Sequence, residues 1–373
     1  MGARGVGSGT QRGNQVDDAR IPTTPDEIDA EWLTDALAER HPGVRVSSVE
    51  VTERHEVTNA HAKLRVRYDE PAGAPETMFC KLAPLDPNRR DSILRTGMGQ
   101  REARFYATLA SRLDLRVPTV HVARQDDRDG TFVLLLEDLD ATGCSVSSGP
   151  EGVPPDSMAR ALEDLASLHL RFLDPAVRAA EVPWIPEVRP SSTYGAVMLR
   201  YGLDNHRDRL NDQFAAIAEL YIERADDLQV LWHLGPKTVI HGDAHIGNVF
   251  FDNGRTGFLD WGIINVNTPM REVSYFITMA LTVEDRRTHE RDLLAHYLEL
   301  WNSGGGAKIT WDEAWLAHRL HTAYTVPACC QVVMFPENAS ERRRVFADAF
   351  LARALAALDD LDARAAIREV GDF

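Results

Sequence analysis

The side chains best suited to chemistry in this sequence lie between His241 and Gly262. Asp243 precedes Asn248 in an Asp-x4-Asn spacing with apolar residues on both sides, and a second carboxylate, Asp260, follows a short turn-containing segment. Phosphoryl transfer needs a carboxylate aimed at the attacking hydroxyl group and hard oxygen ligands for Mg²⁺. These three residues supply that set, so the segment predicts a magnesium-dependent phosphotransferase.

The elements around these residues are expected to be a loop followed by a hairpin. In kinase catalytic loops the same Asp-x4-Asn spacing places a proton-accepting Asp before a metal-binding Asn. Asp252-Asn253-Gly254 is strong turn chemistry, and residues 256–259 return as a strand that delivers Asp260. The hairpin therefore predicts that Asp260 reaches the same site as the loop.

The rest of the chain predicts an α+β fold of two lobes, a small antiparallel-sheet lobe followed by a larger, mainly helical lobe. Hydrophobic periodicity predicts a first helix over 25–40, strands over 44–53, 61–68 and 77–82, a helix over 99–113, and strands over 117–123 and 131–136. After a Gly, Ser and Pro-rich break at 143–155, amphipathic helices are predicted over 156–173, 204–228, 270–281, 284–302, 311–333 and 339–362. The predicted division is a disordered tail over 1–22, an N-terminal lobe over 23–140 and a C-terminal lobe over 141–373.

Composition narrows the class of protein. The chain has 373 residues, of which 44% are hydrophobic, and a formal charge of −16, which argues against a nucleic-acid-binding surface. No apolar run is long enough to span a membrane. Four cysteines without metal-ligand spacing are typical of reduced thiols in a cytoplasmic protein. The acidic charge is compatible with a cationic substrate and equally with a solvated acidic surface.

The segment from His241 to Gly262 resembles the aminoglycoside phosphotransferase superfamily, which includes choline kinase-like and ecdysteroid kinase-like enzymes and has a protein-kinase-like fold. The resemblance covers residues 44–330, and the segment after Thr282 is more similar to the ecdysteroid kinase-like branch than to drug-resistance enzymes. It implies that ATP with Mg²⁺ is the donor. It also implies that Asp243 is the catalytic base and that Asn248 and Asp260 bind the metal.

Further residues are assigned by this resemblance to nucleotide binding in the N-terminal lobe. Lys81 resembles the third-strand lysine that binds nucleotide phosphates, and Glu102 resembles its ion-pair partner. Glu137 and Leu139 lie in the segment that resembles the hinge, whose backbone reads adenine. The phosphate-covering turn lacks the glycine expected in it, although Thr58 and Asn59 match the Ser-Asn found in many relatives.

Two alternatives remain open from the residues. His241, Asp243 and His245 would share one face of an extended strand, an arrangement that a transition-metal hydrolase could use, although it leaves Asn248 and Asp260 without a role. A nucleotide-binding pseudokinase without turnover would keep the same fold. In the phosphotransferase interpretation, His241 supports the loop backbone and His245 lies near the acceptor.

The acceptor itself is predicted only as a class. The resemblance implies a small molecule with a hydroxyl group, which is aminoglycoside-, aminoalcohol-, sugar- or sterol-like. The acceptor pocket is expected to involve residues 184–233 and parts of 285–330. Glu272 occupies the position of an Asp found in relatives after a Gly-x-Pro motif and is interpreted as structural. The oligomeric state does not follow from the sequence.

Overall fold

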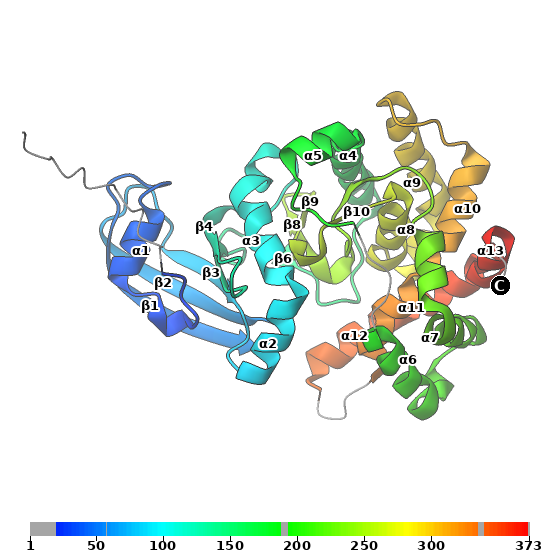
Figure 1. Ribbon diagram of the computed structural model, residues 1–373, viewed down its shortest axis with the longest axis horizontal. Coiled ribbons are helices and arrows are strands. Elements are labelled where there is room, and N and C mark those ends of the chain that lie inside the picture. The colour runs from blue at the N-terminus through cyan, green and yellow to red at the C-terminus, as the bar shows by residue number, and fades with distance from the viewer. Residues whose placement is uncertain (1–19, 57, 188–192, 335–338, 372–373) are drawn as a thin grey trace, which may run out of the picture.

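A computed structural model describes residues 20–56, 58–187, 193–334 and 339–371. The sheet lobe lies at one end of the long axis and the helical lobe at the other, with α3 between them (Figure 1). This arrangement confirms the predicted α+β, two-lobed fold. Most of the predicted disordered tail lies outside the described residues, but Arg20 is held in place, since its carbonyl accepts the indole N–H of Trp32 at 2.8 Å.

The first lobe is built on a five-stranded antiparallel sheet in the order β1-β2-β3-β5-β4. Its strands are β1 (Arg45–Glu56), β2 (Ala60–Glu70), β3 (Thr77–Leu82), β4 (Val120–Gln125) and β5 (Phe132–Glu137). Alternate residues of β5 face opposite sides of the sheet: Val133 and Leu135 pack with the α1 side, whereas Leu134 and Leu136 pack with the α3 side. The sheet is therefore buried on both faces around its centre.

Three α-helices accompany this sheet, and two of them were expected. They are α1 (Ala30–Leu37), α2 (Pro87–Thr96) and α3 (Met98–Thr108). The predicted first helix divides into a 3₁₀ turn, Pro25–Glu27, and α1, which Asp29 caps by accepting the Trp32 N–H at 2.8 Å. Helix α2 was not predicted, because it buries none of its residues and so has no apolar stripe.

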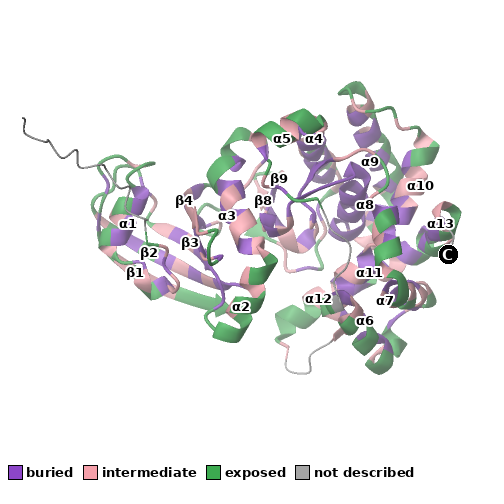
Figure 2. Ribbon diagram, viewed as in Figure 1, coloured by how far each residue is buried: buried purple, intermediate pink, exposed green. Residues whose placement is uncertain are grey.

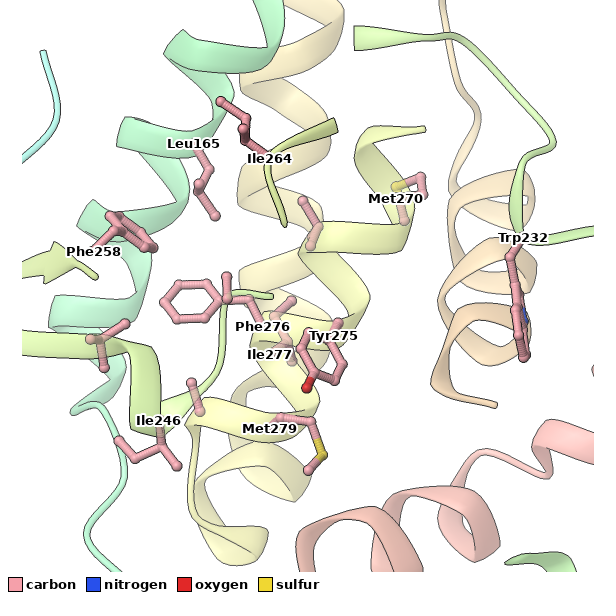
Figure 3. Close-up of a cluster of buried hydrophobic side chains, with 14 of the residues drawn as sticks. Leu165, Trp232, Ile246, Phe258, Ile264, Met270, Tyr275, Phe276, Ile277 and Met279 are labelled. Atoms are coloured by element: carbon pink, nitrogen blue, oxygen red, sulfur yellow. The ribbon is translucent and has the colours of Figure 1, made fainter. Parts of the chain in front are cut away.

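The second lobe contains ten α-helices in the described residues. They are α4 (Pro155–Arg171), α5 (Pro175–Glu181), α6 (Thr193–Asn205), α7 (Asp212–Trp232), α8 (Pro269–Ala280), α9 (Val283–Ser303), α10 (Trp311–Thr322), α11 (Thr325–Ala328), α12 (Glu341–Asp360) and α13 (Ala363–Val370). Every residue of α8 is buried, and the helix runs through the middle of the lobe (Figure 2). Figure 3 shows Phe276 pointing toward Phe258, while Tyr275 lies on another side of α8. Phe276 therefore faces the segment that contains Phe258, whereas Tyr275 lies on a different side of the same helix.

Short strands bring the predicted catalytic segment together. Strand β7 (Thr238–Ile240) pairs with β10 (Asn265–Asn267), and β8 (Val249–Asp252) pairs with both β9 (Arg255–Phe258) and the short β6 (Ser145–Val146). The predicted turn between β8 and β9 is present, with Asn253 and Gly254 at φ of 48° and 83°. Two residues at positive φ make a tight hairpin turn, as the Asn-Gly dipeptide predicted.

The helical lobe departs from the prediction mainly before β7. The helix predicted over 204–228 is instead the end of α6, a break, and α7, because Asn211 caps α7 by accepting the Phe214 N–H at 2.9 Å. No helix in the described part of the chain is both long and apolar enough to cross a membrane. All four cysteines are free thiols.

Candidate active site

One buried carboxylate, that of Glu272, binds the backbone of the loop that follows β7. Glu272 of α8 accepts the backbone N–H of His241 at 3.1 Å and that of Gly242 at 2.8 Å, and it lies 2.9 Å from His169 Nε2. Burial alone would raise the pKa of Glu272, but the hydrogen bond and charge of His169 outweigh it and lower the pKa. Glu272 therefore binds the backbone of the loop and His169, which are contacts that a structural residue makes.

Gly242 is required by this backbone. Its φ is +91°, and a Cβ there would lie 2.5 Å from both the carbonyl oxygen of Ile263 and the side-chain Nδ2 of Asn265. A residue with a side chain would therefore be strained by its conformation and would also collide with the segment after Asp260. The glycine lets the catalytic loop and that segment touch.

His241 cross-links the loop to the strand that leads to Asp260. Its Nε2 donates to the carbonyl oxygen of Leu259 at 2.7 Å, and its Nδ1 accepts the backbone N–H of Asp243 at 3.2 Å. Both ring nitrogens are therefore occupied by protein groups, and residues 241–245 do not form a strand. Among the described residues, no three His, Cys, Asp or Glu side chains gather as a metal site. Residues 241–245 thus lack the shared strand face on which the transition-metal alternative rests.

Asp243 is oriented from two directions. The Asn248 side-chain amide donates to both the Asp243 carbonyl oxygen and its Oδ2, each at 3.0 Å. From α8, the hydroxyl of Tyr275 donates to Asp243 Oδ1 at 3.3 Å. The carboxylate keeps about a third of its side-chain surface exposed, since its side chain is 31% accessible. Asp243 is thus fixed in direction but open to a ligand.

Asp260 begins the segment on the opposite side of the site. Its backbone is left-handed, with φ 57° and ψ 67°, and its side chain is 46% exposed. Leu259 donates its N–H to the Asn248 carbonyl oxygen at 2.8 Å, which keeps Asp260 beside the catalytic loop. Arg101 of α3 donates to the Gly262 carbonyl oxygen at 2.9 Å and so holds the turn after Asp260. The structure thus brings Asp243, Asn248 and Asp260 together.

Lys81 connects the sheet lobe to this site. Its Nζ lies 2.6 Å from Glu102 Oε2 on α3 and 3.0 Å from Asp260 Oδ1. Burial alone lowers the pKa of Lys81, but the charges of Asp260 and Glu102 more than compensate and raise it. The expected Lys81–Glu102 ion pair is therefore present, and the ammonium group stays charged. The stacked rings of Phe105 and Trp261, with centroids 4.0 Å apart, join α3 to the same turn.

In the predicted hinge segment, the Glu137 side chain forms hydrogen bonds with other protein groups. The carboxylate of Glu137 accepts from Arg116 at 2.8 Å and 3.0 Å, from the Thr119 N–H at 2.9 Å and from the Thr142 hydroxyl at 2.8 Å. Although burial opposes ionisation, these donors, led by Arg116, lower the pKa of Glu137 to about 2. The Leu139 carbonyl oxygen accepts the Cys144 N–H at 2.9 Å. Binding of a nucleotide base by this segment would therefore use those backbone groups that do not already hydrogen-bond to the protein.

The two other predicted residues lie at the edges of the site. Asn59, at the start of β2, is buried, and its Oδ1 has no hydrogen-bond partner in the described part of the chain. Val57, in the same predicted turn, lies outside the described residues. His245 accepts the Gly247 N–H at 2.9 Å, and its Nε2 is 3.6 Å from Asp243 Oδ2. Its ring meets Phe350 of α12 with centroids 5.0 Å apart.

Three contributors to the site were missed from the sequence. Tyr275 lies three positions after Glu272, a helical spacing that puts both near the loop once α8 is placed against it. Arg101 immediately precedes Glu102 on α3. Arg116 donates to both Glu137 and Asp252, at 2.8 Å and 2.7 Å for the closest contacts. Of the three, only Tyr275 could have been recognised from the sequence, by its helical spacing from Glu272. That spacing becomes informative only once the position of α8 against the loop is known.

Comparison with known proteins identifies the family of the chain. The sequence profile of the phosphotransferase enzyme family matches residues 64–311. Similar solved structures include a macrolide 2′-phosphotransferase from Brachybacterium faecium (19% identity, 86% of this chain and 98% of that one, TM-score 0.44). They also include a choline kinase from Streptococcus pneumoniae (14%, 89% and 98%, 0.46) and an ethanolamine kinase from Plasmodium vivax (12%, 84% and 83%, 0.46). No curated protein matched the chain. Because the family profile spans well over half of the sequence, the chain belongs to the phosphotransferase enzyme family.

Proposed function

We propose that this protein transfers the γ-phosphoryl group of ATP, with Mg²⁺, to a hydroxyl group of a small molecule. The observation that carries the proposal is the contact between Lys81 and Asp260, whose Nζ and Oδ1 atoms are 3.0 Å apart. It puts Lys81, the proposed phosphate-binding cation from the sheet lobe, beside Asp260, the proposed metal-binding carboxylate from the helical lobe. Asp243 and Asn248 lie next to that carboxylate, so all the groups that phosphoryl transfer needs converge.

Asp243 is proposed as the catalytic base. The acceptor's oxygen forms a bond to the γ-phosphorus, the bond from that phosphorus to ADP breaks, and the hydroxyl proton moves to the Asp243 carboxylate. The hydrogen bonds from Asn248 and Tyr275 support this role because they hold the carboxylate in one direction before the acceptor binds.

Asn248 and Asp260 are proposed to hold Mg²⁺. The donors fit the ion, since Mg²⁺ prefers oxygen ligands and commonly binds through one or two protein groups together with phosphate oxygens. The amide nitrogen of Asn248 is directed at Asp243, which leaves its oxygen as the ligand atom. Lys81 contacts Oδ1 of Asp260, and the half-exposed carboxylate keeps Oδ2 for the ion. The ion, when bound, would neutralise charge on the phosphates.

Lys81 is proposed to position the phosphates, with Glu102 holding it. The nucleotide would lie between the lobes, with its base at the backbone of the Glu137–Leu139 segment and its phosphates below the turn that contains Asn59. The unpartnered Oδ1 of Asn59 supports a ligand contact at that turn. Placement of the nucleotide there also supports the division into a nucleotide-binding lobe over 23–140 and an acceptor-binding lobe over 141–373.

The acceptor is proposed to be a small hydroxylated molecule that reaches Asp243 past His245. The names of the similar structures include a macrolide, choline and ethanolamine phosphotransferase, so the fold accepts varied alcohols. A small-molecule kinase of this kind would act in the cytoplasm, where ATP is available. The pseudokinase alternative is less favoured, because Asp243, Asn248, Asp260 and Lys81 are all present and oriented.

The test is ATP-dependent phosphorylation of a library of aminoglycosides, aminoalcohols, sugars and hydroxylated lipids by wild type and Asp243→Asn. We expect a phosphorylated product from wild type and a kcat reduced about 10²- to 10⁴-fold in the variant, the range of general-base catalysis. Calorimetry should show ATP binding that depends on Mg²⁺ in both proteins. Equal turnover by the two proteins would remove Asp243 from its role, and magnesium-dependent binding without any turnover would favour the pseudokinase.

A further inference from the structure

Arg271 of α8 is a buried arginine without an anion. Its side chain belongs to a residue that is 5% exposed, and its Nε and Nη1 have no hydrogen-bond partner among the described residues. The contact that it does make is with an aromatic ring, since its Cζ lies 3.9 Å from the ring centroid of Tyr324. A guanidinium group removed from water without a paired charge is costly, so its retention calls for an explanation.

The other two buried arginines in the described part of the chain each bind carboxylates or carbonyl oxygens of the protein, although Nε of Arg286 and Nη1 of Arg353 have no partner there. Arg286 pairs with Glu290 at 2.6 Å and also with Asp360. Arg353 donates to three carbonyl oxygens, those of Leu281 at 2.7 Å and of residues 150 and 151 at 3.1 Å and 3.2 Å. Both are therefore structural cross-links. Arg271 differs from them because no described protein group fills the place that a carboxylate or carbonyl fills for the others.

Arg271 lies on the side of α8 that faces Asp243. Tyr275, four positions later and so on the same helical face, donates its hydroxyl to Asp243. The ring of Tyr324 meets Tyr275 edge-on with centroids 5.6 Å apart and lies beneath the Arg271 guanidinium. One helical turn rises about 5.4 Å, so Arg271 lies roughly one turn beyond the tyrosine that contacts the catalytic carboxylate. The buried ring of Tyr275 and the half-buried ring of Tyr324 thus connect Asp243 to Arg271 through side-chain contacts.

The surroundings of Arg271 are cationic. Burial first, and then the charges of Arg271, His318 and Lys237, lower the pKa of His321 to about 3. His321 is buried, and its Nδ1 has no partner within the described residues. The carboxylate that opposes the charge of Lys237 is that of Glu187, an exposed residue bridged to Val266 of β10. The buried carboxylate of Glu290 lies 3.6 Å from His318, whereas no carboxylate of the described residues pairs with Arg271.

We propose that the acceptor carries an anionic group, a carboxylate, sulfate or phosphate, which Arg271 binds while the acceptor's hydroxyl group lies at Asp243. This proposal rests on the phosphotransfer function proposed above and narrows its substrate class. The anion supplies the charge that the guanidinium lacks, and the half-buried ring of Tyr324, which contacts both Arg271 and Tyr275, lies between the two polar ends. A paired guanidinium and carboxylate also align a ligand, because their hydrogen bonds are directional.

The test compares hydroxy acids with their methyl esters as acceptors for wild type, Arg271→Gln and Arg271→Lys. In wild type we expect kcat/KM for an acid to exceed that for its ester at least about tenfold, as for a charge-assisted contact. Arg271→Gln should remove this preference through a higher KM for the acid, with the ester unaffected, and Arg271→Lys should restore part of it. Equal use of acid and ester by wild type, or a preference that survives Arg271→Gln, overturns the proposal while phosphotransfer stands.

A second measurement separates a binding role from a structural one. Without ligand, Arg271→Gln should melt no lower than wild type, because it removes an unpaired buried charge. The matched control, Arg286→Gln, should melt lower because it leaves Glu290 without its partner, and it should keep the preference for acids. An Arg271→Gln protein that melts as low as Arg286→Gln would make Arg271 structural and overturn the proposal.

If no acceptor in the library is phosphorylated, the proposed phosphotransfer fails and calorimetry decides the anion site alone. Hydroxy acids are titrated into wild type and Arg271→Gln without nucleotide. Binding that is stronger for the acid than for the ester and is lost in Arg271→Gln supports the site. Absence of any Arg271-dependent binding of the acids overturns it.

Discussion

Tyr275 donates its hydroxyl group to the carboxylate of Asp243 across 3.3 Å, so a fully buried helix contributes directly to the catalytic loop. The same helix holds the loop backbone through Glu272. Burial, and next the charge of Asp243, raise the pKa of Tyr275 well above its ordinary value, so the phenol keeps the proton that it donates. Two side chains of α8 therefore determine where the loop lies and where its carboxylate points.

Replacement of Tyr275 by Phe should lower kcat by about tenfold, the effect of one hydrogen bond to a charged group, with KM for ATP unchanged. Steady-state kinetics at saturating ATP measure this. Tyr68→Phe is the control, because Tyr68 donates to the Pro75 carbonyl oxygen in the sheet lobe, remote from Asp243. A Tyr275→Phe enzyme with wild-type kcat would show that Asn248 alone orients the carboxylate.

Replacement of Glu102 by Gln should destabilise the protein by about 1–3 kcal/mol, because Lys81 keeps only Asp260 as a charge partner and because burial, which raises the pKa of Glu102 to about 7, reduces the contribution of its charge near neutral pH. The looser lysine should also raise KM for ATP about tenfold. Urea denaturation and ATP titrations measure the two effects. The exposed pair of Glu50 and Arg65 provides the control, and Glu50→Gln should cost less than about 1 kcal/mol. Similar losses of stability in Glu102→Gln and Glu50→Gln would contradict the prediction that the buried ion pair contributes more than the exposed one.

Replacement of Glu272 by Gln should cost ~2 kcal/mol near neutral pH, because an amide cannot accept from both loop N–H groups and from His169 as a carboxylate does. The pKa of Glu272 is lowered from 4.5, so its contribution is fully present above that pH and is lost as the pH falls through the lower folded-state value. Denaturation of both proteins over this range should therefore show converging stabilities at acidic pH. A constant difference would mean that the carboxylate's charge is irrelevant.

Replacement of Gly242 by Ala should reduce both stability and kcat. Gly242 and Gly43 have nearly the same φ, +91° and +88°, but a Cβ at Gly43 meets nothing within 4 Å, whereas one at Gly242 lies 2.5 Å from two atoms. Gly43→Ala should therefore cost only the backbone strain, about 1–2 kcal/mol, and leave kcat unchanged. Thermal melts and kinetics of both variants distinguish the clash from the strain. Equal melting temperatures of Gly242→Ala and Gly43→Ala would mean that backbone strain at positive φ, and not the steric clash, accounts for the loss of stability.

The parts of the fold that follow from local patterns were predictable. Strand β3 begins and ends at the predicted residues, and the β8–β9 hairpin follows from its Asn-Gly turn. Helices α2 and α5 bury no residues, so no apolar periodicity marks them. The break between α6 and α7 depends on a cap at Asn211 within a sequence that otherwise continues a helical pattern.

The candidate site divides in the same way. Asp243, Asn248 and Asp260 are predictable because a loop and one hairpin bring them together over a short stretch of chain. Tyr275 and Arg271 reach the site only through the packing of α8 against that loop, which is a tertiary relationship without a local pattern. The contact between Lys81 and Asp260 is also tertiary, and it was expected only through the family resemblance.

The position of Arg116 limits how the two lobes can separate. This side chain binds Glu137, where the last sheet strand of the first lobe ends, and Asp252 in the β8–β9 hairpin. A swing of the entire sheet lobe, which carries both Arg116 and Glu137, would therefore have to pull the guanidinium group off Asp252.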